Sequence, residues 1–429
     1  MSRKTGEETP MMKQYREARE SLEPDTLLLF RLGDFYEMFE KDAERGAALL
    51  GITLTKRHDM AMAGIPFHAA EAYLTKLLHL GHKVAICDQL EPPKTGKLVK
   101  RGITRILTPG TVLEDRQMDA VSNHFLLAFD LESKGARASW LDLSTGKFVL
   151  SESHCLQDFL SLLSSLSPRE ILIPESFDKK TSGLENDSLF RPEFDRLVAG
   201  ISITERPDFD FDQRSGAREV MESLGVMNLE GFGIDLSHPS LGSAGAVLIY
   251  CQDVLRGKPG NLSRIEELRV GEAVLLDPAT QRNLEIFKTS SQIRKGSLLD
   301  SMDATASAGG ARLLERFLSQ PERDLNEIKR RQSCVREFAQ LSMVVEEVAG
   351  FLRKGSDLER ILGRLRNRLV RPRELGGLRS TLRNLPGIRT ALKSVGHEYE
   401  AILSLADQLE TYDELAAFLD KSLEEELPA

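Results

Sequence analysis

Apolar and polar positions divide the chain into two mixed α/β stretches followed by a long helical one. In the first stretch, apolar runs of strand length at 26–37 and 83–90 are separated by a segment of helical spacing at 39–50. A strand-length run returns at 125–129. From about residue 261 onward, apolar residues recur at the spacing of amphipathic helices. The pattern predicts an α/β and all-α multidomain fold.

These changes in pattern predict three domains. We place a mixed α/β domain at residues 1–120, a second α/β domain at 121–260 and a helical domain at 261–429. Within the second domain, residues 177–215 are polar and irregular, and we expect only connecting structure there. A chain of 429 residues is too long for one compact core, which agrees with several domains.

The composition is that of an ordinary globular chain with an excess of acidic residues. Hydrophobic residues make up 41%, charged residues 29%, and the formal net charge is −9, so the whole chain is not a simple basic nucleic-acid binder. Any DNA contact must come from local basic patches, and residues 92–113 form one, with five basic residues and no acidic residue. The four cysteines form no Cys-x-x-Cys pair, and no apolar run reaches membrane-spanning length. We therefore expect a soluble cytoplasmic protein without a metal site.

The most informative segment is 27–37, Leu-Leu-Leu-Phe-Arg-Leu-Gly-Asp-Phe-Tyr-Glu. In a single strand the side chains alternate between two faces, so Phe35 and Glu37 would share a face with Arg31, and Tyr36 would lie on the other. An exposed aromatic ring beside a carboxylate can stack on a base and hydrogen-bond its edge. From the residues alone the simpler interpretation is favoured, with Phe35 in a small core and Glu37 at a solvated strand end.

A resemblance to a known family changes this balance. Residues 33–39, Gly-Asp-Phe-Tyr-Glu-Met-Phe, resemble the mismatch-reading motif of the MutS family of DNA mismatch-recognition proteins. Further segments resemble that family in the same order along the chain: Leu54–Arg57, Met62–Ala69, Val84–Gln89, Arg105–Thr111, Trp140–Gly146, Asp277–Glu285, Gly296–Leu299, Arg312–Leu314 and Asp357–Arg360. The chain is identified as a member of this family, with a resemblance across nearly its whole length.

The resemblance implies a mixed α/β mismatch-binding domain, a ribonuclease H-like α/β connector and a partial all-helical core or lever domain. It assigns Phe35 as the ring that wedges against a mispaired base from the minor groove, and Glu37 as the group that hydrogen-bonds this base. A mispaired step kinks easily, and inserting a wedge costs on the order of a few kcal/mol of unstacking. Arg57 and Arg105 are implied as phosphate contacts. Met62 is implied as a neighbour of the DNA, and a role in the core is the alternative.

The resemblance also bears on cofactors and partners. No Gly-x-x-x-x-Gly-Lys-Ser/Thr motif occurs, so we expect no catalysis by this chain. ATP and magnesium are implied for the DNA-dependent ATPase domain of the family. The chain stops near the point where the family's clamp should begin, which makes the family homodimer doubtful here. The implied partners are mismatched duplex DNA and, on the connector, a MutL-type repair protein, in a bacterial cytoplasm and associated with the nucleoid.

Two other functions are left open. One is a metal-dependent nuclease, because ribonuclease H-like folds cleave nucleic acid with clustered carboxylates. Asp142 lies on a predicted strand, but Glu170 and Asp235 do not complete a convincing set of metal ligands. The other is a protein-interaction fragment that docks the MutL-type partner and has no useful DNA affinity of its own.

Overall fold

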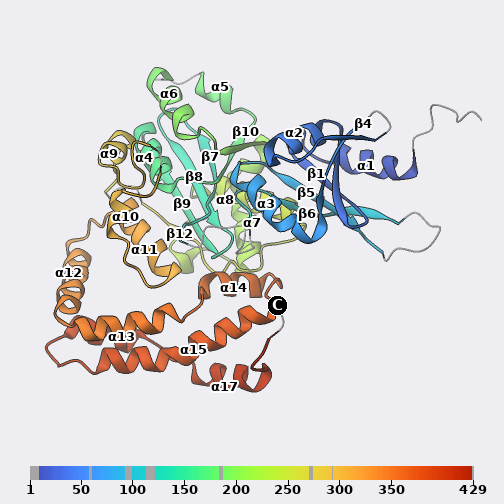
Figure 1. The fold of residues 1–429 in the computed structure, drawn as a ribbon. Helices are drawn as coiled ribbons and strands as arrows, with labels where there is room; N and C mark the ends of the chain where they lie inside the picture. The colour runs from blue at the N-terminus through green and yellow to red at the C-terminus, as the bar shows by residue number, and fades with distance from the viewer. Residues whose placement is uncertain are drawn as a thin grey trace, which may run out of the picture.

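Figure 1 shows the chain in a computed structural model, as two sheets with helices against them and a helical arm at the C-terminal side. The structure describes residues 9–57, 60–91, 99–112, 121–182, 187–269, 274–291 and 293–427. Within these ranges no helix is long and apolar enough to cross a membrane. The predicted α/β and all-α multidomain fold is confirmed.

The N-terminal domain is built on a six-stranded sheet in the order β3-β4-β2-β1-β5-β6. Only β1 and β5 are parallel, and the other neighbours are antiparallel. Its strands are β1 (Leu27–Leu32), β2 (Phe35–Phe39), β3 (Thr55–Arg57), β4 (Met60–Pro66), β5 (Val84–Gln89) and β6 (Arg101–Leu107).

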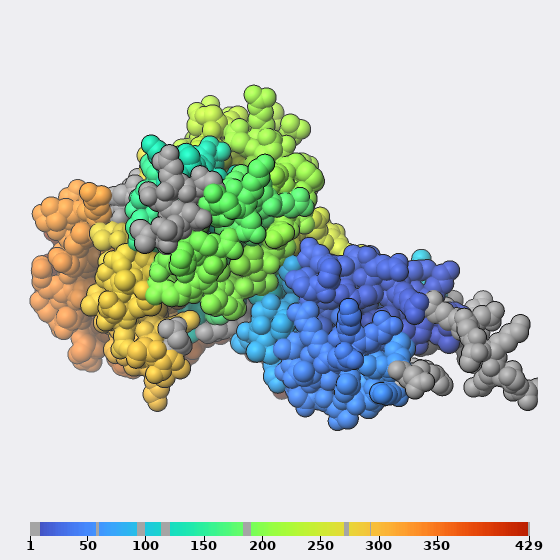
Figure 2. Space-filling model, turned by 90° about the horizontal axis from the view of Figure 1, so that it is seen from above, coloured from blue at the N-terminus to red at the C-terminus, as the bar shows by residue number. Residues whose placement is uncertain are grey.

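Helices cover both faces of this sheet. Helix α1 (Pro10–Glu20) begins with Thr9 as its cap and Pro10 at its first position, and it packs Met12 and Tyr15 onto one face. Helices α2 (Glu40–Leu50) and α3 (Ala70–His79) bury their apolar sides against the other face. Figure 2 shows this domain as a lobe that projects from the rest of the molecule.

The second domain has a six-stranded sheet in the order β11-β10-β7-β8-β9-β12. Strands β7, β8 and β9 form an antiparallel meander, and β10 and β11 continue from β7 in parallel. This agrees with the ribonuclease H-like connector that the resemblance implies. Its strands are β7 (Leu126–Leu131), β8 (Ala136–Asp142), β9 (Lys147–Ser153), β10 (Glu170–Pro174), β11 (Ser202–Arg206) and β12 (Glu266–Glu267).

Five helices enclose the connector sheet, three on one face and two on the other. They are α4 (Leu156–Leu166), α5 (Phe177–Thr181), α6 (Asp187–Leu197), α7 (Gln213–Leu224) and α8 (Leu241–Leu255). Helix α8 is buried along most of its length, because the sheet, α7 and the N-terminal domain all pack around it. Ile106 of β6 packs against the same core, so the two domains share an apolar contact.

The rest of the chain is helical, as predicted, and Figure 1 shows its later helices as an arm that extends below the connector. Two small apolar cores hold the arm together, one around Ile361 and Leu378 and one around Ile388 and Ile402. The helices are α9 (Pro278–Asn283), α10 (Leu298–Met302), α11 (Ala308–Ser319), α12 (Leu325–Gln340), α13 (Ser342–Arg353), α14 (Leu358–Arg366), α15 (Pro372–Lys393), α16 (Glu400–Gln408) and α17 (Asp413–Ser422).

Two predictions about local structure are wrong. The segment 26–37 is two strands rather than one, because the chain turns back at residues 33 and 34. Residues 177–215 are not irregular, since they contain α5, α6, β11 and the start of α7. Aromatic side chains such as Phe190 and Phe194 pack into the connector core, and the polar side chains of Thr181, Thr204 and Asp210 are buried as well. Strand β12 lies beyond the boundary predicted at residue 260 and pairs with β9 of the connector.

Candidate nucleic-acid interface

A tight hairpin sets the position of Phe35 and Glu37. Gly33 has a positive φ of 57° at the first of the two loop residues, where glycine is favoured in this kind of hairpin turn. The backbone N–H of Phe67 donates to the carbonyl of Asp34 at 2.8 Å, which ties the turn to the end of β4. The hairpin therefore presents the start of β2, with Phe35 as its first residue, at the end of the sheet.

The turn reverses the predicted assignment of faces. Phe35 lies opposite Leu32, and Glu37 lies opposite Phe30, and directly opposed residues of antiparallel strands project from the same face. Phe35 and Glu37 thus share the face of Phe30, whereas Tyr36 shares the other face with Arg31. The prediction that Phe35 and Glu37 lie with Arg31 is wrong, because two turn residues were counted as part of a continuous strand.

Along β2 the exposure changes sharply. Phe39 is fully buried beneath Tyr15 of α1, with the two rings 4.9 Å apart between centroids. Phe35 lies on the same face at the other end of the strand and is 46% exposed. Glu37 lies between them and is half-buried. The ring of Phe35 is therefore accessible from outside the domain while its strand is anchored in the core.

A glycine lies beside these two side chains on the neighbouring strand. Gly64 of β4 is directly opposite Glu37, and a Cβ atom at that position would lie 3.6 Å from the Glu37 Cγ and 3.8 Å from a ring carbon of Phe35. A larger side chain there would fill the space next to both groups. Met62 pairs with Phe39 two residues away, is half-buried, and packs against the apolar cluster under α1.

The opposite face carries a second aromatic group. The Arg31 guanidinium lies 3.3 Å from the centroid of the Phe67 ring, and the Tyr36 hydroxyl donates to Asp88 at 2.9 Å. Burial, followed by the hydrogen bond to Asp88, raises the pKa of Tyr36 well above its usual value, so the phenol remains a proton donor. Phe67 is 47% exposed, which makes it a natural comparison for Phe35.

The predicted basic contacts are not gathered around Phe35. Arg105 is exposed on β6 opposite Ile86, which places it on the face of Tyr36. Arg57 is the last residue of β3, and its side chain lies outside the described residues, as do Lys94 and Lys97 of the basic stretch.

Arg101 is one of the five basic residues of the stretch 92–113, and the structure gives it a specific place. Its guanidinium lies 5.4 Å from the centroid of the Phe30 ring and donates to the carbonyl of Arg31 at 2.7 Å. This puts a cation on the same face as Phe35 and Glu37. In the sequence, the absence of acidic residues from 92–113 indicated a basic patch. Selecting Arg101 within that patch required the register of β5 with β6.

The carboxylates considered for a nuclease have other roles. Asp142 accepts hydrogen bonds from the backbone and hydroxyl of Ser144 and from the backbone of His124. Glu170 is fully buried and accepts from four donors, whereas Asp235 is exposed and bonded to Ser237. In the part of the chain that the structure describes, no group of three or more His, Cys, Asp or Glu side chains could hold a metal ion.

Comparison with known proteins gives a consistent result along the chain. Residues 9–116 match the family model for MutS domain I, residues 124–266 that for MutS domain II, and residues 279–428 that for MutS domain III. Proteins named DNA mismatch repair protein MutS from Symbiobacterium thermophilum and Myxococcus xanthus are each 37% identical over 98% of this chain. One from Syntrophobacter fumaroxidans is 38% identical over 90% of it. These alignments cover 48%, 47% and 43% of the three relatives, so the chain spans about half their length.

Proposed function

The chain belongs to the MutS family, and from this premise we propose that it binds mismatched or unpaired bases in duplex DNA as a step in DNA mismatch repair. The observation that carries the proposal is the position of Phe35, a half-exposed aromatic ring at the end of a strand whose other end is fixed in the core. The relatives are named for DNA mismatch repair, and the hairpin between β1 and β2 holds the Phe35 ring in an exposed position.

The ring of Phe35 acts as the wedge. A flat apolar side chain that projects from a rigid strand can enter a base step, and the cost of unstacking is smallest where the bases are already mispaired. Glu37 follows on the same face and hydrogen-bonds the displaced base. Arg101 on this face, together with Arg57, contacts phosphates, which fix the position of the protein without reading sequence, and Arg105 contacts phosphates from the other face of the sheet. Met62 pairs with Phe39 on the face of Phe35 and Glu37, and it lies next to the bound DNA in this proposal.

Partners and cofactors are part of the same proposal. The ribonuclease H-like connector docks a MutL-type repair protein. The three matched regions are MutS domains I, II and III. We therefore propose that this chain acts by binding, and that ATP and magnesium, which the resemblance implies for the family's ATPase domain, are not used by residues 1–429.

The proposal is tested by the ratio of affinities for a G·T heteroduplex and the matching homoduplex, measured by fluorescence anisotropy at several salt concentrations. The unaltered chain is expected to prefer the heteroduplex. Phe35→Ala is expected to bring the ratio close to one, with little change in thermal stability because the ring is half-exposed. Phe67→Ala removes an equally exposed ring from the other face and is expected to keep the preference.

Each contrary result has a defined meaning. If Phe35→Ala keeps the heteroduplex preference and Phe67→Ala loses it, the other face of the sheet reads the DNA. If the unaltered chain binds both duplexes equally at every salt concentration, the chain is better described as a protein-interaction module.

A further inference from the structure

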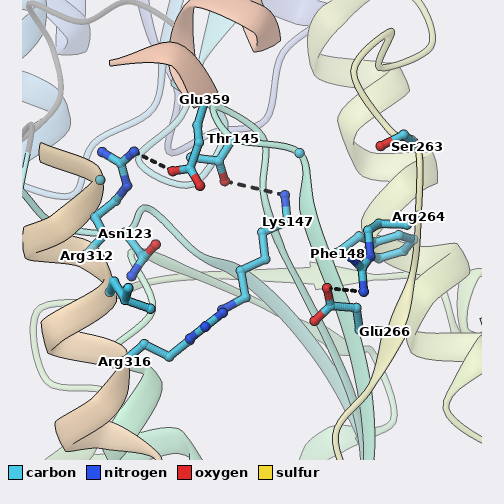
Figure 3. A pocket seen from close by; sticks show the side chains of 13 residues that line it. Asn123, Thr145, Lys147, Phe148, Ser263, Arg264, Glu266, Arg312, Arg316 and Glu359 are labelled. Carbon is cyan, nitrogen blue, oxygen red and sulfur yellow. Dashed lines mark hydrogen bonds and ion pairs between the residues drawn. The ribbon is translucent and has the colours of Figure 1, made fainter. Parts of the chain in front are cut away.

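A cavity lies where the connector meets the helical domain, and all of its lining residues are distant from Phe35 along the chain. Its volume is about 260 Å³, and it is lined by the turn between β8 and β9, the loop that leads to β12, and helices α11 and α14. Figure 3 shows the charged side chains that reach into it. The family comparison assigns no role to this cavity.

The charges that line the cavity do not balance. Four basic side chains and two acidic ones contribute to its wall: Lys147, Arg264, Arg312, Arg316, Glu266 and Glu359. Two of the basic groups are neutralised locally. Arg264 pairs with Glu266 at 2.8 Å, and Arg312 pairs with both Glu359 at 2.5 Å and Asp357 at 2.7 Å. With Asp357 counted, four basic and three acidic side chains leave one net positive charge, and Lys147 and Arg316 are the two basic groups without a carboxylate partner among the described residues.

Lys147 and Arg316 approach the cavity from different domains. Lys147 is the first residue of β9 in the connector, Arg316 lies on α11, and Figure 3 shows both side chains directed into the same space. Over the ranges that the structure describes, neither head group forms an ion pair within 4 Å.

The surroundings of Lys147 disfavour its positive charge. Burial, followed by the charge of Arg316, lowers the pKa of Lys147, while Glu266, Asp142 and Glu359 act in the opposite direction without overcoming these two effects. Two like charges held together in a partly buried space destabilise the folded chain unless an anion joins them.

We propose that the cavity binds a small phosphate-bearing anion, held between Lys147 of the connector and Arg316 of α11. A phosphate monoester carries about −1.5 to −2 charges at neutral pH, so it can bond to both Lys147 and Arg316. Lysine and arginine both bind phosphate through charge-assisted hydrogen bonds, and the Asn123 side chain adds a neutral polar group to the wall. The volume is small relative to typical ligand pockets of roughly 300–1,000 Å³, which favours a single phosphate group over a long chain or a duplex.

Binding of this anion would join two domains. It removes the repulsion between Lys147 and Arg316 and bridges β9 to α11, so the folded state with the domains in contact gains stability as the ligand concentration rises. This inference is independent of the mismatch-reading proposal, because its residues belong to the connector and helical domain and its test contains no DNA.

The test is a titration of the 429-residue chain with inorganic phosphate and, in a second arm, with adenosine monophosphate, at constant ionic strength. Isothermal calorimetry and the melting temperature are the measurements. We expect saturable binding and a rise in melting temperature in at least one arm. If inorganic phosphate binds, the free anion is enough to occupy the cavity. If adenosine monophosphate binds and inorganic phosphate does not, the ligand is a phosphomonoester.

Variants connect the signal to the cavity. Lys147→Gln and Arg316→Gln are each expected to weaken binding roughly tenfold or more, as for the loss of one charge-assisted hydrogen bond. Lys134→Gln in the connector and Arg336→Gln on α12 remove exposed charges outside the cavity and are expected to leave binding unchanged. Phosphorus NMR line broadening with the unaltered chain gives a readout that does not depend on how the variants fold.

Two results would overturn the inference. One is the absence of saturable binding of either phosphate compound by the unaltered chain. The other is equal binding by the unaltered chain and by a folded variant that carries both Lys147→Gln and Arg316→Gln.

Discussion

At the scale of single residues, position along a strand separates structural from functional aromatic side chains. Phe35 and Phe39 belong to the same strand and the same face, yet Phe39 is fully buried under Tyr15 and Phe35 projects beyond the core. Truncating a buried phenylalanine costs about 3–5 kcal/mol, whereas an exposed ring contributes much less to folding. An effect of Phe35→Ala on DNA binding can therefore be interpreted directly.

Asp357 shows how one residue joins two helices through charge. Its carboxylate accepts hydrogen bonds of 2.7 and 2.8 Å from the Arg312 guanidinium, and the two side chains are only 17% and 4% exposed. Burial alone would raise the pKa of Asp357, but the hydrogen bonds and charge of Arg312 outweigh it and lower the pKa below its ordinary value. The ion pair thus stabilises the contact between α11 and the start of α14.

We predict a pH-dependent effect of Asp357→Asn. Because the folded-state pKa lies below the unfolded value of about 3.9, the stabilisation is complete above that pH and is lost as the pH falls through the folded-state pKa. The substitution is expected to lower the free energy of unfolding by roughly 1–3 kcal/mol at pH 7 and by progressively less below about pH 4. Urea denaturation at pH 7 and at pH 3 measures this difference.

The matched control is Asp407→Asn. Asp407 lies on α16 and forms an exposed ion pair with Lys393 of α15, so its loss is expected to change the free energy of unfolding by less than about 0.5 kcal/mol. A loss for Asp357→Asn that is the same at pH 7 and at pH 3 would contradict the role given to the Arg312 pair.

At the scale of secondary-structure elements, close backbone approach fixes how α14 docks on the connector. The helix passes over the turn between β8 and β9, and a Cβ atom at Gly363 would lie 2.2 Å from the carbonyl oxygen of Ser144. The Asn261 amide donates to the carbonyl of Leu143 at 2.6 Å on the same side of the turn. Glycine is therefore needed at position 363 for its small size.

We predict that Gly363→Ala lowers the melting temperature although alanine is the better helix former. The added methyl group must push α14 away from the turn, at a cost of roughly 1–3 kcal/mol, which exceeds the gain in helix propensity of about 1 kcal/mol. Faster hydrogen exchange at residues 143–147 should accompany the loss.

Gly350→Ala is the control for this prediction. Gly350 lies inside α13 with open space where its Cβ atom would be, so alanine there is expected to be neutral or stabilising by up to about 1 kcal/mol. If both substitutions had the same effect, the contact between α14 and Ser144 would not determine the docking.

At the scale of the whole molecule, one buried carboxylate connects the N-terminal domain to the connector. Glu170 on β10 accepts hydrogen bonds from Thr108 and the Gly110 backbone, which follow β6, and from Thr204 and Tyr250 of the connector. Burial and the charge of Glu170 raise the pKa of Tyr250 well above its usual value, so this phenol stays a donor. The segment that leaves the N-terminal domain is thereby held at a defined place.

We predict that Glu170→Leu weakens the connection between the two domains. Four buried donors would lose their acceptor, and leaving a buried donor unsatisfied costs about 1–3 kcal/mol. Hydrogen exchange at residues 108–112 is expected to accelerate, and small-angle scattering should report a broader range of shapes.

Glu170→Gln keeps an acceptor oxygen and should have a smaller effect, while Glu175→Leu, at an exposed position near the end of the same strand, should have none on residues 108–112. Unchanged exchange in Glu170→Leu would show that apolar contacts such as that of Ile106 are sufficient to hold the domains together.

The sequence by itself determined the family, the order of α/β and helical regions, and many element boundaries. The helix predicted at 39–50 is found at Glu40–Leu50 with Gly51 as its cap. Such features can be predicted from the sequence because hydrophobic periodicity and capping residues act over a few neighbouring positions.

Tertiary structure alone decided which side chains share a face and which charges meet. The turn at Gly33 moved Phe35 and Glu37 to the face of Phe30, and strand register placed Arg105 on the opposite side. Arg316 and Lys147 converge across a domain junction although about 170 residues of chain separate them. A local pattern specifies how a segment folds, but pairing register and domain docking depend on partners that are distant along the chain, so only the folded chain can define these sites.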